Sequence, residues 1–313
     1  MLKRALITAY IHPYLQQQLE NSGWQVSVQP DITYEELQLI IDHFSLLIIT
    51  TYLRIDKNII DHAQHLKIIG RVGSGMENVD MAYCIEKGIS CFNSPEGNAN
   101  AVGEHALALL LALYNRITIA NNELKLGIFN REYNRGEELD GKTVGIIGFG
   151  HTGAAFAKKL MGFDVSILAY DPNKEIKQTN IIQTSLHHLQ QEADIISFHV
   201  PYSAETHHYC NAAFLQTCIK KPTIINTSRG AVCDTQAILT ALRQQTIYGF
   251  CVDVFEDEPL TKNKINPTVV YEEILEFPNV IATPHIAGWS RQSKLKLVEV
   301  LWNKIAKHLA GQG

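Results

Sequence analysis

Three short motifs carry side chains whose types and positions could do chemistry together. Arg229, a group of four carboxylates within residues 252–259, and His285 each follow a short apolar run that reads as a buried strand. Because open α/β sheets bind ligands at the carboxyl ends of their parallel strands, we expect these three motifs to lie close together in space. The sequence therefore predicts a site that combines a guanidinium, a carboxylate and an imidazole.

This combination suits hydride transfer between a nicotinamide and a 2-oxo acid. Arg229 would hold the substrate carboxylate and carbonyl oxygen through its planar fork of donors. His285 would donate the proton that accompanies reduction and remove it in the opposite direction. A carboxylate hydrogen-bonded to the ring would favour the imidazolium form and fix its orientation. Taken singly, the same residues could be a surface ion pair, an exposed acidic loop and a structural histidine.

A glycine-rich motif supplies the hypothesis of a dinucleotide cofactor. Gly148, Gly150 and Gly153 follow the strand-like run 142–147 and open a small-residue segment of helical character. Such glycines permit a tight turn, let a pyrophosphate approach the backbone, and let helix and strand pack closely. Asp171 ends the next apolar run and would accept hydrogen bonds from the adenosine ribose, which favours NAD over NADP. We expect the pyrophosphate at the amino end of the helix.

The elements that must position these residues alternate along the whole chain, which indicates an α/β fold with parallel sheets. We expect a doubly wound N-terminal unit, in which a capping box of Thr33 and Glu36 opens one helix. Its predicted strands are residues 4–8, 25–28, 46–50, 67–72 and 89–92. A dinucleotide-binding unit begins near residue 142, with predicted strands at 142–147, 165–170, 195–200, 223–226, 248–252 and 280–282.

The division into domains follows from the segments between these units. Residues 93–98 are rich in turn formers, and residues 99–119 predict a helix that is apolar on nearly all sides and is therefore buried. After Pro284 only one further helix is expected, 290–309, and it must pack onto something already built. We therefore expect a discontinuous substrate domain, 1–98 with 287–313, and a Rossmann domain, 99–286, with a ligand cleft between them. The helix 99–119 favours a homodimer.

Composition limits the classes of partner. The chain has 313 residues and a formal net charge of −5, which gives no electrostatic reason to expect nucleic acid or an anionic membrane. The six cysteines are scattered and contain no C-x-x-C pair, so no disulfide framework or metal site is expected. The histidine pairs at 187–188 and 207–208 are expected to be surface or capping residues. No signal peptide or membrane-spanning run is visible, which favours a cytoplasmic protein.

Taken in order, these motifs resemble those of the D-isomer-specific 2-hydroxyacid dehydrogenase family over essentially the whole chain. The resemblance implies a flavodoxin-like substrate domain beside the Rossmann domain. It also implies that Arg229, Glu258 and His285 form the catalytic set, with Glu258, rather than Glu256 or Asp257, as the partner of the histidine. Asp253 matches the aspartate that contacts the nicotinamide amide. The segment 98–105 resembles the start of the interdomain helix in this family.

The resemblance also extends to the residues that bind the ligands. The substrate loop would be Arg71, Val72, Gly73, Ser74 and Gly75, with the backbone N–H groups of Val72 to Gly75 holding the substrate carboxylate. The residues expected to bind NAD share positions in the glycine turn or at strand ends: Gly148, Gly150, His151, Thr152, Gly153, Tyr170, Asp171, His199, Val200, Pro201, Thr206, Thr227, Ser228, Asp253 and Gly288.

The substrate is less well specified than the family. The short length leaves no room for the regulatory domain of long phosphoglycerate dehydrogenases, yet Arg54 or Arg71 could bind a substrate phosphate, which favours a 3-phosphoglycerate type of enzyme. The alternatives are a glyoxylate/hydroxypyruvate reductase and a 4-phosphoerythronate dehydrogenase. Residues 50–54 depart from the family pattern, because a frequent substrate-side arginine is absent there. An NAD-sensing corepressor is the non-enzymatic alternative.

Overall fold

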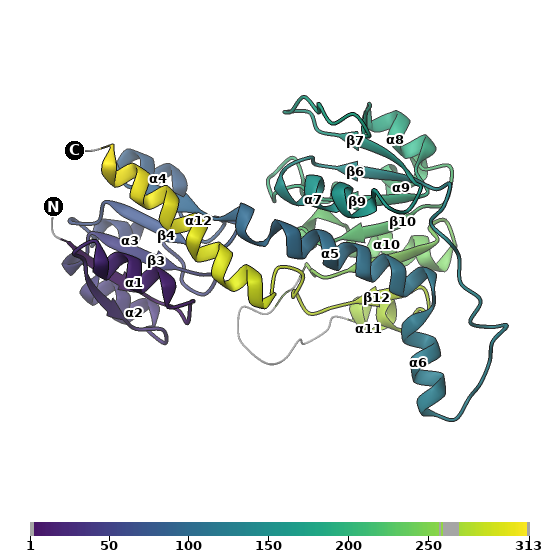
Figure 1. The fold of residues 1–313 in the computed structure, drawn as a ribbon, viewed down its shortest axis with the longest axis horizontal. Helices are drawn as coiled ribbons and strands as arrows, with labels where there is room; N and C mark the ends of the chain where they lie inside the picture. The colour runs from purple at the N-terminus through teal and green to yellow at the C-terminus, as the bar shows by residue number, and fades with distance from the viewer. Residues whose placement is uncertain (1–2, 257, 259–268, 312–313) are drawn as a thin grey trace. The chain divides into compact units, whose positions relative to one another are not determined.

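The computed structural model describes residues 3–256, 258 and 269–311. The chain divides into two compact units, one of residues Met1–Asn98 with Trp289–Gly313 and one of residues Ala99–Gly288 (Figure 1). Each unit holds one sheet, and all strand pairings among the described residues of these sheets are parallel. With helices on both faces of each sheet, the structure confirms the predicted α/β class with two doubly wound units.

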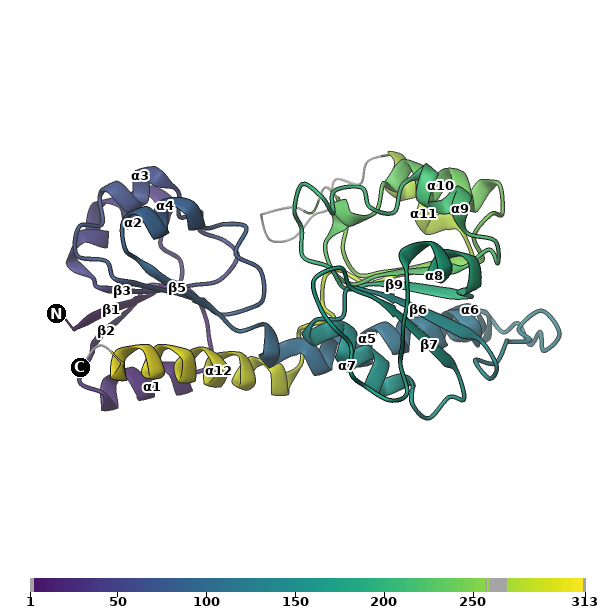
Figure 2. The same cartoon turned by 90° about the horizontal axis from the view of Figure 1, so that it is seen from above.

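The first unit is built on a five-stranded sheet in the order β2-β1-β3-β4-β5, the flavodoxin-like order. Its strands are β1 (Arg4–Ile7), β2 (Gln25–Val28), β3 (Leu46–Ile49), β4 (Ile68–Arg71) and β5 (Ser90–Asn93). One face carries α1 (Tyr14–Asn21) and α12 (Arg291–Ala310) (Figure 2). The opposite face carries α2 (Tyr34–Ile40), the 3-10 turn η1 (Ile41–His43), α3 (Lys57–Asp61) and α4 (Met81–Glu86).

The C-terminal helix belongs to this first unit. Ser290 caps α12 by accepting a hydrogen bond from the backbone N–H of Ser293. Fully buried apolar side chains along one stripe of α12, Val298, Leu301 and Ile305, pack into the same core as Leu15 and Leu19 of α1. The apolar face of α12 thus shares a core with α1, although about 270 residues of sequence separate the two helices.

The predicted capping box is confirmed at the start of α2. The Glu36 N–H donates to Thr33 Oγ1 at 3.2 Å, and the Thr33 N–H donates to Glu36 Oε2 at 2.9 Å. This exchange satisfies two donors that a helix start would otherwise leave without partners. A local sequence signal was sufficient here because every group involved lies within four residues.

The second unit is built on a seven-stranded sheet in the order β12-β11-β10-β9-β6-β7-β8. Its strands are β6 (Thr143–Ile147), β7 (Ser166–Tyr170), β8 (Ile182–Gln183), β9 (Ile195–Phe198), β10 (Thr223–Asn226), β11 (Gly249–Val252) and β12 (Val280–Ala282). Figure 2 shows α5 (Pro95–Tyr114) and α7 (His151–Leu160) on one face of this sheet. The other face carries α8 (Leu186–Glu192), α9 (Ala212–Thr217), α10 (Thr235–Arg243) and α11 (Val269–Glu276), and the 3-10 turn η2 (Gly230–Val232) follows β10.

The expected long helix at residues 99–119 is wrong in both its bounds. Helix α5 runs over Pro95–Tyr114, and a separate helix, α6, runs over Ile117–Lys125. Pro95 can begin a helix because the first turn has no use for its missing N–H, so the turn-forming residues near it do not mark a loop. Arg116 takes a left-handed conformation (φ 52°), which ends the first helix. No helix in the described part of the chain is long and apolar enough to cross a membrane.

The glycine-rich turn joins β6 to α7 with almost no space between them. A Cβ atom added to Gly153 would lie 2.1 Å from the carbonyl oxygen of Gly148, whose own φ is +86°. A Cβ on Gly150 would meet nothing within 4 Å. The two outer glycines are therefore required by the packing of the turn itself, whereas the middle one faces open space.

This contrast predicts opposite results for two single-methyl substitutions. Gly153→Ala is expected to lower the free energy of unfolding by about 1–3 kcal/mol, because the added methyl must displace backbone. Gly150→Ala serves as the control and should change it by no more than about 0.5 kcal/mol. Urea denaturation followed by circular dichroism measures both, and equal stabilities for the two variants would contradict the packing described here.

Candidate active site

The loop after β10 holds Arg229 through a set of local hydrogen bonds. Asn226 Oδ1 accepts from the backbone N–H and the hydroxyl of Ser228, at 3.1 and 2.8 Å, and Asn226 Nδ2 donates to Arg229 O at 2.9 Å. The guanidinium is half-buried, and its Nη1 donates to Ser228 O at 2.7 Å. These hydrogen bonds hold the backbone and the guanidinium of Arg229 next to the end of the buried strand β10.

Direct backbone packing brings this loop against the acidic segment after β11. A Cβ on Gly230 would lie 1.9 Å from Phe255 O and 2.5 Å from Glu256 N, so only glycine fits at this position. The contact joins the residue after Arg229 to a residue three before Glu258. The first two motifs of the predicted site are therefore neighbours in the structure.

Glu258 and His285 form a close pair. His285 Nδ1 lies 2.5 Å from Glu258 Oε2, and Glu258 Oε1 accepts the backbone N–H of Phe255 at 2.9 Å. The backbone bond orients the carboxylate, and the carboxylate in turn orients the ring. The remaining ring nitrogen, Nε2, makes no hydrogen bond to the described residues, and the imidazole is about half-exposed.

Glu256, the nearby acid that the resemblance had set aside, has a different set of partners. Its Oε1 lies 2.5 Å from His208 Nε2, and its Oε2 accepts the backbone N–H of Thr235 at 2.8 Å. Glu256 therefore ties the first residue of α10 to the segment after β11. His208 was expected to be a surface or capping residue, and the sequence gave no sign of this hydrogen bond because 48 residues separate the partners. Asp257 lies outside the described residues.

Asp253 is fully buried, with a relative exposure of 0%. Its Oδ1 accepts from the Thr283 hydroxyl at 2.5 Å and the Ile286 N–H at 2.9 Å, and its Oδ2 accepts the Ala287 N–H at 2.8 Å. Its backbone carbonyl accepts the His285 N–H at 2.7 Å. The residue predicted to contact a nicotinamide amide thus also holds the whole turn that carries His285.

Asp171 lies at the end of β7 and is likewise engaged with the glycine turn. Its Oδ2 accepts the Phe149 N–H at 2.8 Å, and its Oδ1 accepts the Asn173 N–H at 3.0 Å. Lys174, which the sequence had not singled out, donates from Nζ to Phe149 O at 2.9 Å. The expected contact with a ribose stays a prediction, to which the structure adds a role for the carboxylate in shaping the turn.

The remaining predicted cofactor residues lie around the same edge of the sheet. His151 and Thr152 form the first turn of α7, whose N-cap, Gly150, provides no side-chain cap among the described residues. Tyr170 ends β7, and Thr206 closes its own loop by donating to Pro201 O at 2.7 Å. The other members are Val200, which follows β9, Ser228, in the loop after β10, and Gly288, the last residue of the unit.

His199 and Thr227 differ in what they present to a ligand. The His199 side chain is buried, its Nε2 lies 2.9 Å from Ser197 Oγ, and burial lowers its pKa to about 3. The ring is therefore neutral and structural, which leaves the backbone of this residue for any contact with a cofactor. The Thr227 side chain is only 8% exposed, and its hydroxyl has no hydrogen-bond partner among the described residues.

The predicted substrate loop lies in the first unit and needs one correction. The Val72 N–H donates to Ile49 O at 2.9 Å and the Gly73 N–H donates to Ser94 Oγ at 3.1 Å, so neither is available to a substrate carboxylate. The prediction that all N–H groups from Val72 to Gly75 face the substrate is wrong for these two, because β4 pairing and the buried Ser94 use them. For the Ser74 and Gly75 N–H groups, substrate binding stays a prediction.

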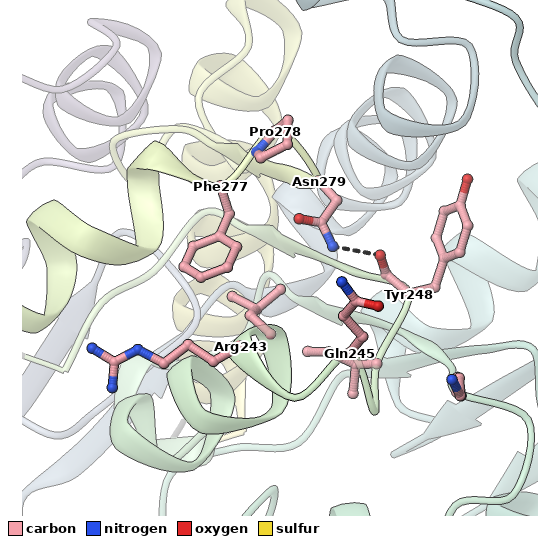
Figure 3. Close-up of a pocket in the computed structure, with 9 residues that line it drawn as sticks. Arg243, Gln245, Tyr248, Phe277, Pro278 and Asn279 are labelled. Carbon is pink, nitrogen blue, oxygen red and sulfur yellow. Dashed lines mark hydrogen bonds between the residues drawn. The ribbon is translucent and has the colours of Figure 1, made fainter. Parts of the chain in front are cut away.

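A separate cavity of about 470 Å³ lies at the amino ends of β10, β11 and β12 (Figure 3). Asn279 Nδ2 donates there to Tyr248 O at 2.6 Å, and Arg243 is paired with Glu273. Arg229 and Asp253 follow the opposite, carboxyl ends of these strands, so this cavity is not part of the predicted site. Within the described residues, no group of three or more His, Cys, Asp or Glu side chains is placed to hold a metal ion.

The sequence of this chain matches a known protein family. The family model for the D-isomer specific 2-hydroxyacid dehydrogenase NAD binding domain matches residues 107–287. The hydroxypyruvate reductase of Thermotoga maritima is 34% identical over 275 residues, 88% of each chain. The D-3-phosphoglycerate dehydrogenase of Methanocaldococcus jannaschii is 32% identical over 99% of this chain and 58% of its own. The chain belongs to the D-isomer specific 2-hydroxyacid dehydrogenase family.

Solved structures agree with this assignment. The structure of D-lactate dehydrogenase from Aquifex aeolicus, complexed with NAD and lactic acid, matches 98% of this chain and 96% of its own with a TM-score of 0.82 and 28% identity. Membership of the family makes this dehydrogenase an NAD-dependent oxidoreductase, as its motifs predicted. The residues present fit NAD, because Gly150 leaves open space at the start of α7 and the buried Thr227 hydroxyl lacks a partner in the part of the chain that the structure describes.

The unpartnered hydroxyl predicts a selective loss of cofactor binding. Thr227→Val keeps the shape of the side chain and removes a buried polar group, so the stability of the apo-enzyme should stay the same or rise. If NAD satisfies this hydroxyl, the variant should bind NADH about tenfold more weakly, the effect of one hydrogen bond. Fluorescence titration with NADH measures the change, and unaltered affinity would remove Thr227 from the cofactor site.

Proposed function

We propose that this dehydrogenase interconverts a D-2-hydroxy acid and the corresponding 2-oxo acid, with Arg229, Glu258 and His285 as its catalytic residues. The observation that carries the proposal is the Glu258–His285 pair, which leaves Nε2 of a half-exposed imidazole to exchange a proton. An imidazole that is oriented by a carboxylate on one nitrogen and reaches solvent with the other suits general acid–base catalysis.

The roles follow from what each side chain can hold or move. Bound NAD supplies the chemistry of hydride acceptance and, as NADH, of hydride donation. His285 gives the proton from Nε2 to the carbonyl oxygen of the oxo acid, and Glu258 stabilises the protonated ring from the Nδ1 side. Arg229 binds the carboxylate and the carbonyl oxygen of the substrate through two parallel N–H donors. In the oxidation direction His285 removes the hydroxyl proton.

We further propose a substrate of the 3-phosphoglycerate type. Arg71, at the end of β4, supports this choice because it places a cation in the substrate loop. It is only 8% exposed, and its Nη1 lies directly against Gly73. Arg54, the other arginine considered from the sequence, is 80% exposed and 4.0 Å from Asp56, so it is the weaker candidate for a phosphate.

A small unphosphorylated oxo acid is the second candidate. The chain spans 88% of the length of the hydroxypyruvate reductase relative, whereas it spans about half the length of the phosphoglycerate dehydrogenases that it matches. The 34% identity to a hydroxypyruvate reductase and the position of Arg71 favour different substrates, which makes the choice an experimental one.

A panel of oxo acids separates the two candidates. NADH oxidation would be followed at 340 nm with 3-phosphohydroxypyruvate, 2-oxo-3-hydroxy-4-phosphobutanoate, hydroxypyruvate, glyoxylate and pyruvate. The proposal expects the highest kcat/KM for 3-phosphohydroxypyruvate, with a large loss in the Arg71→Gln variant. A preference for hydroxypyruvate or glyoxylate would favour the reductase. Bound NADH without turnover on any substrate would contradict both and leave the NAD-sensing alternative.

The catalytic assignment makes a separate prediction. His285→Gln should lower kcat by about 10²–10⁴-fold, the usual contribution of a general acid, with little change in the Kd for NADH. Glu258→Gln should also lower kcat, because a neutral amide cannot stabilise the protonated ring. Steady-state kinetics and NADH titration give the two readouts. A His285→Gln variant that keeps the wild-type kcat would remove His285 from the mechanism.

We propose that the enzyme is a homodimer, although the reason differs from the one the sequence suggested. Buried residues of α5 such as Leu109, Leu110 and Leu113 pack in the core of their own unit. Exposed apolar side chains occur instead on α6 and after it, where Leu126 is 77% and Phe129 is 79% exposed. Such apolar surface on one segment is typical of an interface. A second copy of the chain is the partner that we assign to it.

Light scattering at micromolar protein concentration tests this assignment. The dimer should have a mass of about 70 kDa, twice the 35.1 kDa of one chain. Phe129→Glu should shift the mass toward the monomer, because a charge in an apolar interface is strongly unfavourable. Leu39→Glu, at an exposed apolar position on α2, is the control and should leave the mass unchanged. A wild-type protein of 35 kDa would contradict the proposal.

A further inference from the structure

A chain of hydrogen bonds connects α5 to the turn that carries His285. His105 Nε2 on α5 lies 2.8 Å from Thr283 Oγ1, and Thr283 Oγ1 donates to Asp253 Oδ1 at 2.5 Å. His105 Nε2 is also 3.6 Å from the same carboxylate oxygen. The side chains of His105 and Asp253 are mostly or fully buried, so water competes little for these bonds.

The direction of each of these hydrogen bonds is fixed by the number of protons that the Thr283 hydroxyl and the Asp253 carboxylate carry. A threonine hydroxyl has one proton, and the Asp253 carboxylate, which already accepts two backbone N–H groups, can only accept. The Thr283 proton is therefore directed at Asp253, and its oxygen must accept from His105. This requires a proton on Nε2 of His105. His105 is the only donor among the described residues that the structure assigns to the Thr283 hydroxyl oxygen.

The turn that carries His285, which these hydrogen bonds hold, has an unfavourable backbone conformation. His285 has a left-handed backbone (φ 55°), which a residue with a Cβ adopts only when the surrounding structure imposes it. Asp253 imposes it by accepting the Ile286 and Ala287 N–H groups on its carboxylate and the His285 N–H on its carbonyl. Any rotation of the Asp253 side chain would release two of these three bonds.

We infer that His105 is a positioning residue for the reaction, acting through Thr283 and Asp253 to hold His285 against Glu258. The inference rests on the proposed role of His285. His105 touches neither member of the Glu258–His285 pair, so its contribution is to the geometry of the proton donor and not to the proton transfer itself. Loss of its donor lets Thr283 and Asp253 reorient, which loosens the turn that carries His285.

The test compares three substitutions along the chain of bonds. His105→Leu removes the donor, and Thr283→Val removes the hydroxyl with little change of shape. His105→Gln keeps an N–H donor near the position of Nε2 and is the rescue variant. We expect His105→Leu and Thr283→Val each to lower kcat about tenfold, to leave the KM for the oxo acid, which Arg229 binds, within about twofold, and to show no further loss when combined. His105→Gln should restore most of the wild-type kcat.

The same helix provides a matched control. Tyr114 OH on α5 is hydrogen-bonded to Thr223 Oγ1 at 3.1 Å, at the amino end of β10 and away from His285. Tyr114→Phe deletes a buried side-chain hydrogen bond between α5 and a strand of the sheet, whereas His105 bonds to the residue that follows β12. It should lower the melting temperature and leave kcat unchanged. A comparable loss of kcat in Tyr114→Phe would show that α5 acts only through general stability, and would overturn the inference.

Further outcomes separate this inference from the proposed function. If His285→Gln abolishes turnover while His105→Leu and Thr283→Val keep the wild-type kcat, the positioning role is wrong and the catalytic assignment stands. If His285→Gln retains turnover, the catalytic assignment of the proposed function is wrong, and the positioning role of His105 loses its basis. Additive losses in the His105→Leu, Thr283→Val double variant would also overturn the inference, since the two residues would then act independently. NADH titration confirms in each case that the variant is folded.

Discussion

The burial of one carboxylate is the constraint on which the candidate site depends. A charged group with no exposed surface is stable only when donors surround it, and Asp253 obtains three of them from Thr283, Ile286 and Ala287. Collecting those donors bends the chain after β12 into the turn that carries His285. The turn then directs Nδ1 of the ring toward Glu258. A requirement of electrostatics in the interior thus produces the geometry that the proposed chemistry uses.

The sheet brings the parts of this site together because its strands are parallel. The residues after β10, β11 and β12 emerge at one edge, and the close packing of Gly230 on Phe255 removes the space between two of the loops. The turn after β6 emerges at the same edge, where Gly153 lets α7 pack tightly on its strand. The dinucleotide turn and the candidate catalytic residues therefore share a single scaffold, and Asn226, Asp253 and Asp171 each stabilise one loop of it.

Patterns that are local in the sequence were reliable. Apolar runs predicted the strands of both sheets to within one or two residues apart from the short β8, and the capping box of Thr33 and Glu36 formed as expected. The prediction failed for the helix at 99–119, because its start depends on Pro95 and its end on the left-handed Arg116, and neither changes the hydrophobic pattern. Strand β8 was missed because two exposed residues carry no periodic signal.

The sequence by itself determined the fold class, the family and the cofactor, because glycine spacing, strand patterns and the order of motifs are properties of the chain alone. The tertiary structure decided which groups remain available for function. It uses the Val72 and Gly73 N–H groups in the first unit, pairs Glu256 with His208, and buries the His199 ring. The physical reason is that hydrogen-bond partners and burial depend on residues far apart in sequence, as His105 and Thr283 are, and no local pattern records that proximity.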